Sequence, residues 1–147
     1  QAVDRAELAI ELSRRAQQTK IVQDCLIEVN VGEEASKGGV RNEEALTLAK
    51  AVLALPGLKL MGLMSLPPYL PSPEDQRPFH RALAALARTL RDETGAPLPV
   101  LSMGMSHDFE VAIEEGATLV RVGSAQHWFA SDRRFSGRAW RAIKEPA

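Results

Sequence analysis

The sequence is poor in the residues that build several classes of protein. It holds one cysteine, Cys25, which excludes a disulfide framework, and the apolar run around Cys25 predicts that this side chain is buried. The three histidines stand far apart in the sequence and show no metal-ligand spacing. Because the net charge is −1, composition gives no electrostatic reason to expect a nucleic-acid or membrane-surface partner.

Long hydrophobic runs are also missing. No run approaches the about 20 apolar residues that a membrane span needs, and no segment resembles a signal peptide, so we expect a cytoplasmic protein. With 147 residues the chain has about the length of one domain, and we expect residues 1–147 to form a single domain. The chain begins with Gln1 and enters a helix almost at once, so we expect it to be a piece of something longer.

Helices and strands alternate along the chain. We expect strands at residues 21–31, 58–66, 100–103 and 118–122, and helices at residues 4–18, 43–55, 73–91, 107–115 and 137–144. Strict alternation predicts a parallel α/β sheet. If that sheet is part of a barrel, its strands should be neighbours in the order in which they occur in the sequence. The loops that leave the strands are longer or richer in glycine than those that enter them, as in a (β/α)8 barrel or a doubly wound sheet. The absence of a GxGxxG or Walker motif counts against the nucleotide-binding folds.

Small residues follow the last two predicted strands, in the loops Gly104-Met105-Ser106 and Gly123-Ser124-Ala125. Parallel strands bring such loops to the same edge of a sheet, where backbone N–H groups can approach a ligand closely. The first loop also precedes a helix, whose N-terminus favours an anion. These features predict a phosphate site. Capping of the helix is the alternative role for Ser106.

Two cations are candidates for a role at this edge. Arg121 alternates with Val120 and Val122, so it points away from them, either toward a ligand at the strand end or into a surface salt bridge. Lys37 lies in a glycine-bearing loop at the same edge and is the best-placed lysine for carbonyl chemistry, although a solvated loop lysine is the commoner case.

Three motifs resemble one known family. The segment LSMGMSHDFEVAIEEGATLVRVG (residues 101–123) is similar to the signature of the YggS-like pyridoxal phosphate homeostasis proteins, relatives of the alanine racemase barrel domain. LIEVNV (residues 26–31) with Glu34, Ser36, Lys37 and Gly39 is similar to that family's fifth-strand motif. LMGLM (residues 60–64) with Pro67 is similar to its sixth. The resemblance implies a (β/α)8 TIM-type barrel of the alanine racemase type, of which this chain holds the C-terminal part, about strands five to eight.

The resemblance also implies a cofactor, pyridoxal 5′-phosphate, and residues that hold it. Ser106, Gly123 and Ser124 would bind its phosphate, and Arg121 would face the pyridine nitrogen. Met105 and Met64 are further candidates for cofactor contacts, with packing at the strand ends as their alternative role. The lysine that binds the cofactor covalently belongs to the family's first strand, which this chain lacks, and we do not transfer that role to Lys37.

The function implied by the resemblance is binding and delivery of pyridoxal phosphate in vitamin B6 homeostasis, without robust catalysis and with apoenzymes as the candidate partners. A racemase-like enzyme of the same fold is the first alternative, although it needs a second acid or base and Tyr69 is the only tyrosine. A barrel that binds another phosphate ester is the second. Two departures from the family are visible: Ser124 stands where it usually has threonine, and Gln-His-Trp-Phe at residues 126–129 replaces its usual Ile-Phe-Gly.

Overall fold

A computed structural model of the chain describes residues 1–123. The elements follow in the order β1 (Ala2–Val3), α1 (Ala6–Thr19), β2 (Gln23–Val29), α2 (Asn42–Leu53), β3 (Leu58–Ser65), the 3-10 helix η1 (Pro73–Gln76), α3 (Arg77–Thr94), β4 (Val100–Met105), α4 (Phe109–Glu114) and β5 (Leu119–Arg121). Ser124, the loop at 126–129 and the helix expected at 137–144 lie outside the described residues.

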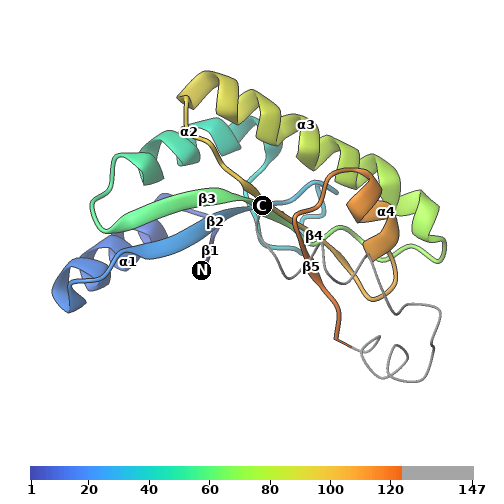
Figure 1. Ribbon diagram of the computed structural model, residues 1–147, viewed down its shortest axis with the longest axis horizontal. Helices are drawn as coiled ribbons and strands as arrows, with labels where there is room; N and C mark the ends of the chain where they lie inside the picture. Colours follow the sequence, from blue (N-terminus) through green and yellow to red (C-terminus); the bar gives the residue numbers. More distant parts are fainter. Residues whose placement is uncertain (124–147) are drawn as a thin grey trace.

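The strands form one parallel sheet in the order β1-β2-β3-β4-β5 (Figure 1). Every strand therefore pairs with its neighbours in the sequence, which confirms the predicted topology. β1 was not predicted from local pattern, because two residues are too few to show alternation. It pairs with β2 in parallel, Ala2 with Leu26 and Val3 with Ile27.

The helices cover one face of this sheet. Right-handed crossovers between strands that follow one another in the same direction place every connecting helix on the same side. Consistent with this, α1 contacts α2, α2 contacts α3 and α3 contacts α4, and α2 and α3 lie together above the curved sheet in Figure 1. A doubly wound sheet would carry helices on both faces. The described residues therefore form an arc of a barrel wall.

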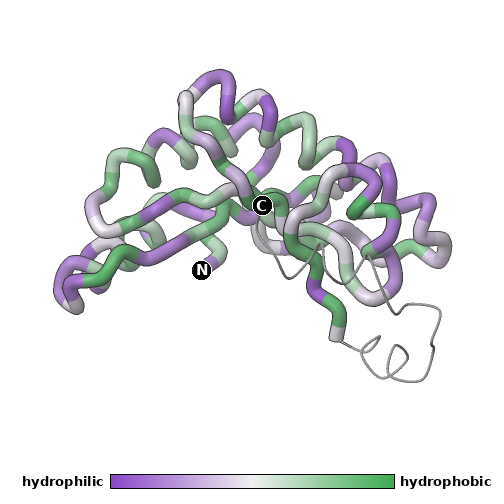
Figure 2. The backbone as a smooth tube through the Cα atoms, viewed as in Figure 1, coloured by the Kyte–Doolittle hydropathy of each residue, from purple (hydrophilic) through white to green (hydrophobic). Residues whose placement is uncertain are grey.

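The core lies between the sheet and its helices. In β2 the residues Cys25, Ile27 and Val29 are buried and alternate with Leu26 and Glu28, which are partly exposed on the other face. Hydrophilic and hydrophobic stretches likewise alternate along α3 (Figure 2). The predicted burial of Cys25 is confirmed. Among residues 1–123, no helix is both long and apolar enough to cross a membrane.

Several element ends differ from the expectation. The helix predicted over 73–91 is divided into η1 and α3, with a proline in the first turn of each, and it runs on to Thr94, where Gly95 takes the left-handed conformation that ends helices. The helix predicted over 107–115 begins only at Phe109. The N-cap position of this helix is therefore Asp108, and Ser106, for which capping was the alternative role, lies in the turn before it.

Candidate functional site

The carboxyl ends of β4 and β5 bring the predicted phosphate residues to one edge. Met105 pairs with Arg121, so the turn that contains Ser106 and the segment that leads to Gly123 leave the sheet side by side. Ser106 is half-buried, whereas Gly123 is exposed. Among residues 1–123, no atom lies within 4 Å of the place where a Cβ of residue 123 would stand, so the described residues leave space beside Gly123. Ser124 lies outside the described residues.

Arg121 lies across the ends of three strands. Its guanidinium donates one hydrogen bond to the hydroxyl of Ser102 on β4 and another, at 2.8 Å, to the carbonyl of Ser65, the last residue of β3. Within residues 1–123 no carboxylate forms an ion pair with it, so the surface salt bridge that we considered is not found there. Burial lowers the pKa of Arg121, although the charges of Asp108 and Glu28 act in the opposite direction. A partly desolvated cation without a counter-ion is suited to an acceptor or an anion.

A buried pair of side chains closes the turn between β4 and α4. His80 of α3 is 0% exposed and Asp108 is 6% exposed, and His80 Nε2 lies 2.7 Å from Asp108 Oδ2. The other carboxylate oxygen, Oδ1, accepts the backbone N–H of Met105 at 2.7 Å. Burial alone would raise the pKa of Asp108, but the hydrogen bonds from His80 and Met105 outweigh it and lower that pKa below its usual range. Asp108 is therefore a carboxylate at neutral pH.

The sequence did not predict this pair. A signal was present, because His80 shares a helical spacing of three and four residues with Leu83, Ala84, Ala87 and Leu90, all buried. Its place on that apolar stripe required a buried partner.

Gly104 sets how closely α4 packs on β4. Its φ is +92°, and a Cβ added there would lie 2.5 Å from the Cβ of Ala112 and 3.1 Å from the Cα of Phe109. Only glycine fits both the backbone conformation and this contact. The small residue that the sequence placed in the candidate phosphate loop is therefore needed for the packing of the helix.

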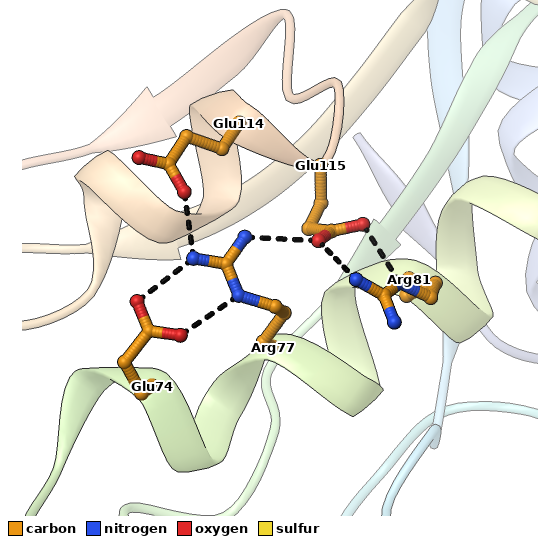
Figure 3. A network of polar contacts seen from close by, with 5 residues as sticks. All are labelled: Glu74, Arg77, Arg81, Glu114 and Glu115. Atoms are coloured by element: carbon orange, nitrogen blue, oxygen red, sulfur yellow. Dashed lines mark hydrogen bonds and ion pairs between the residues drawn. The ribbon is translucent and has the colours of Figure 1, made fainter.

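A network of ion pairs holds α4 to α3 from outside (Figure 3). Arg77 bonds Glu74, Glu114 and Glu115, and Arg81 also bonds Glu115, at distances of 2.6–3.1 Å. Side chains of Arg77 and Glu115 are 22% and 13% exposed, less than those of their partners. The hydrogen bonds from Arg81 and Arg77 lower the pKa of Glu115 from 4.5 to about 2.

We expect Glu115 to stabilise the fold in a pH-dependent way. Its pKa is depressed in the folded protein, so its stabilising contribution is present above pH 4.5 and is lost as the pH falls toward 2. Urea unfolding of the wild type and of Glu115→Gln should therefore differ more at about pH 7 than at about pH 3. Glu110→Gln is the matched control, since Glu110 lies on the same helix, is exposed and pairs with no described cation. A Glu115 effect that does not change between the two pH values would contradict this assignment.

Lys37 is engaged in joining two loops. Its Nζ lies 2.9 Å from the Glu34 carboxylate and donates to the carbonyl of Pro67 at 3.1 Å, which ties the β2–α2 loop to the loop after β3. Lys37 also lines a polar pocket of about 520 Å³ with Asn30, Glu33, Glu34, Ala35, Gly39, Arg41, Glu43 and Glu44. Neither Ser106 nor Arg121 lines that pocket, so we place the candidate site at the strand ends, where both of these residues lie.

The remaining candidates lie around the same edge. Met64 and Met105 are at the carboxyl ends of β3 and β4, and the Met105 side chain is exposed. Tyr69 is 73% exposed, and its ring centroid lies 4.9 Å from that of His107. His107 in turn contacts the carbonyl of Leu70 through Nε2. No cluster of metal-ligating side chains occurs in the part of the chain that the structure describes.

Comparisons with known proteins identify relatives of this chain. The pyridoxal phosphate homeostasis protein of Aquifex aeolicus (strain VF5) is 56% identical over 123 residues, which cover 84% of this chain and 54% of that protein. A protein of unknown function from Bifidobacterium adolescentis superimposes with a TM-score of 0.74 at 38% identity, covering 84% of this chain and 50% of the other. PipY of Synechococcus elongatus PCC7942, solved with pyridoxal phosphate bound, gives a TM-score of 0.75 at 26% identity and coverages of 83% and 57%.

The chain spans about half the length of the curated relatives it matches. Its parallel sheet with helices on one face is thus part of an α/β barrel of the alanine racemase type. The family model described as the alanine racemase N-terminal domain matches residues 1–127. The chain therefore belongs to the alanine racemase N-terminal domain family.

Proposed function

We propose that the protein carrying this chain binds pyridoxal 5′-phosphate and takes part in its homeostasis, holding and delivering the cofactor without robust catalysis. The observation that carries the proposal is the edge where Arg121, which forms no ion pair with a described carboxylate, lies beside the Ser106 turn and the exposed Gly123. The similarity to a protein named for pyridoxal phosphate homeostasis, at 56% identity, supports it, as does PipY with the cofactor bound.

The residues at this edge suit a phosphorylated pyridine. We assign the phosphate to the Ser106 hydroxyl and the backbone of Gly123, together with Ser124 outside the described residues. Arg121 uses two of its five N–H groups on Ser102 and Ser65, which leaves donors for the pyridine nitrogen. When bound, the cofactor supplies a carbonyl that captures amines and a ring that withdraws electrons. Because arginine stays protonated, Arg121 keeps the ring nitrogen an acceptor, which weakens that withdrawal and favours binding over turnover.

The rest of the chain has supporting roles in this proposal. Met64 and Met105 line the cofactor at the ends of β3 and β4. We leave Lys37 out of the covalent anchor, because its Nζ already bridges Glu34 and the Pro67 carbonyl. Residues 1–147 would belong to one barrel domain, and apoenzymes that need pyridoxal phosphate would be the recipients. The cytoplasmic location expected from the sequence stays a prediction.

Ser106→Ala should weaken binding of pyridoxal phosphate to the intact protein by about 1–3 kcal/mol, because a hydrogen bond to a charged phosphate is lost. Titration followed by absorbance near the visible edge measures this. Thr89→Ala is the control, since the exposed Thr89 hydroxyl bonds a backbone carbonyl within α3. Unchanged affinity in Ser106→Ala would remove the serine from the phosphate site.

Two other functions are tested by the same preparation. A racemase-like enzyme would interconvert the two forms of an amino acid, and Tyr69 near His107 would be its first candidate for a second acid or base. Racemisation by the wild type that is lost in Tyr69→Phe would support that function over ours. The second alternative is a site for another phosphate ester. It would be supported if the wild type showed no new absorbance with pyridoxal phosphate but bound another phosphate ester.

A further inference from the structure

We propose that His80 is a positioning residue for the phosphate of the bound ligand, acting through Asp108 on the turn that carries Ser106. The inference rests on the proposed function and adds a residue to it that lies on a different helix and touches no ligand. It assigns to α3 a role in the affinity for phosphorylated ligands in particular.

The turn is closed at both ends by Asp108. The backbone N–H of Asp108 donates to the Met105 carbonyl at 3.1 Å, and the Met105 N–H donates to Asp108 Oδ1 at 2.7 Å. Ser106 and His107 lie inside this closed turn. The direction in which the turn presents Ser106 therefore depends on where the Asp108 carboxylate is held.

His80 holds that carboxylate from outside the turn. Its Nε2 lies 2.7 Å from Asp108 Oδ2, and both side chains are buried. Because Asp108 is ionised, Nε2 must carry the hydrogen and donate it. The ring's Nδ1 has no partner among the described residues, so the bond to Asp108 is the one polar contact there that orients the imidazole.

A second effect concerns charge. A buried carboxylate close to a phosphate site repels the ligand, since little water screens the two negative charges. A hydrogen bond donated by His80 offsets the charge on Asp108, and Arg121 on β5 interacts electrostatically with the same carboxylate. Loss of His80 therefore both loosens the turn and exposes the ligand phosphate to an uncompensated charge.

The test compares two ligands that differ only in the phosphate, pyridoxal phosphate and pyridoxal, on the intact protein. In His80→Phe, which keeps a buried ring but donates nothing, the dissociation constant of pyridoxal phosphate should rise about tenfold and that of pyridoxal by about twofold at most. The amide of the glutamine in His80→Gln can donate to Asp108, so this variant should keep most of the affinity for pyridoxal phosphate that His80→Phe loses. Leu90→Val is the control, because it shortens a buried side chain of the same helix that lies far along the helix from His80. It should leave the ratio of the two dissociation constants unchanged.

The outcomes separate this inference from the proposed function. A wild type that binds neither ligand overturns the proposed function itself. A wild type that binds pyridoxal phosphate, with equal losses for both ligands in His80→Phe or with no loss at all, leaves that function standing and overturns the role of His80. Nitrogen NMR of the wild-type histidines gives a readout that needs no variant to fold: the His80 Nε2–H signal should shift with pyridoxal phosphate and not with pyridoxal. No shift with the phosphorylated ligand overturns the inference.

Discussion

Gly62→Ala is expected to destabilise the intact protein by at least about 4 kcal/mol, or to prevent its folding, because the new methyl group has no room. Gly62 pairs with Val100 where β3 meets β4. A Cβ at Gly62 would lie 1.7 Å from the Val100 carbonyl oxygen and 2.7 Å from its carbon, and φ there is +154°. Relief of this clash requires the two central strands to separate, with loss of their hydrogen bonds. Urea unfolding followed by circular dichroism measures the change.

Gly116→Ala is the matched control for this experiment. Gly116 has φ +102°, but a Cβ there would meet no atom within 4 Å, so the substitution strains the backbone without a clash. We expect it to cost about 1–2 kcal/mol, the usual penalty for a side chain in a left-handed conformation. If the two variants lose equal stability, the close approach of β3 and β4 is not the reason why position 62 requires glycine.

Asp108→Ala is expected to cost about 3–5 kcal/mol of folding stability, because it leaves His80 buried without a partner and opens the Met105–Asp108 turn. Thermal unfolding of the intact protein without ligand measures it. Glu110→Ala, two residues further along the same segment and exposed, should be close to neutral. The double variant His80→Phe with Asp108→Leu should lose less than the sum of its single variants, since an apolar pair leaves no buried charge unsatisfied.

The same carboxylate predicts a direction for the pH dependence. The pKa of Asp108 is lowered in the folded protein from an ordinary value of 3.8, so its contribution is present above that value and disappears as the pH falls below it. The stability difference between the wild type and Asp108→Ala should therefore narrow in acid. A difference that widens as the pH falls would show that Asp108 is protonated in the folded state.

The strands could be predicted from the sequence because burial on one face forces a visible pattern. Alternation in β2 and the apolar runs in β3 and β4 were sufficient to place them, and the order of strands followed from the interpretation of the chain as part of a barrel. The predicted start of β2 at Ile21 was too early, because Ile21 and Val22 are hydrophobic and were included in the strand on that ground alone. Ile21 and Val22 are exposed, and the Ile21 N–H bonds the Ala16 carbonyl at the end of α1.

The candidate site was predictable only in part, for a physical reason. Ser106, Arg121 and Gly123 lie at strand ends, and strand ends are given by the local pattern. The pairing of His80 with Asp108 joins residues 28 positions apart, and the Arg121 contact with Ser65 joins residues 56 apart. Such contacts depend on how α3 and β5 pack against the other helices and strands. The spacing of residues within α3 or within β5 does not reveal this packing.

The sequential order of the strands also affects how the sheet unfolds locally. Within residues 1–123 each strand pairs only with its immediate neighbours, so local unfolding can spread one βα unit at a time, and we expect amide exchange to be graded across the sheet. β5 has three residues and one paired neighbour among those described, so we expect it, like the short β1 at the other edge, to detach before the inner strands. Arg121 is the last of those three residues, and its bonds to Ser102 and Ser65 fasten β5 to β4 and β3. A ligand that binds Arg121 would then oppose the detachment of β5. Slower amide exchange in β5 would measure the fraction of the protein that has the ligand bound.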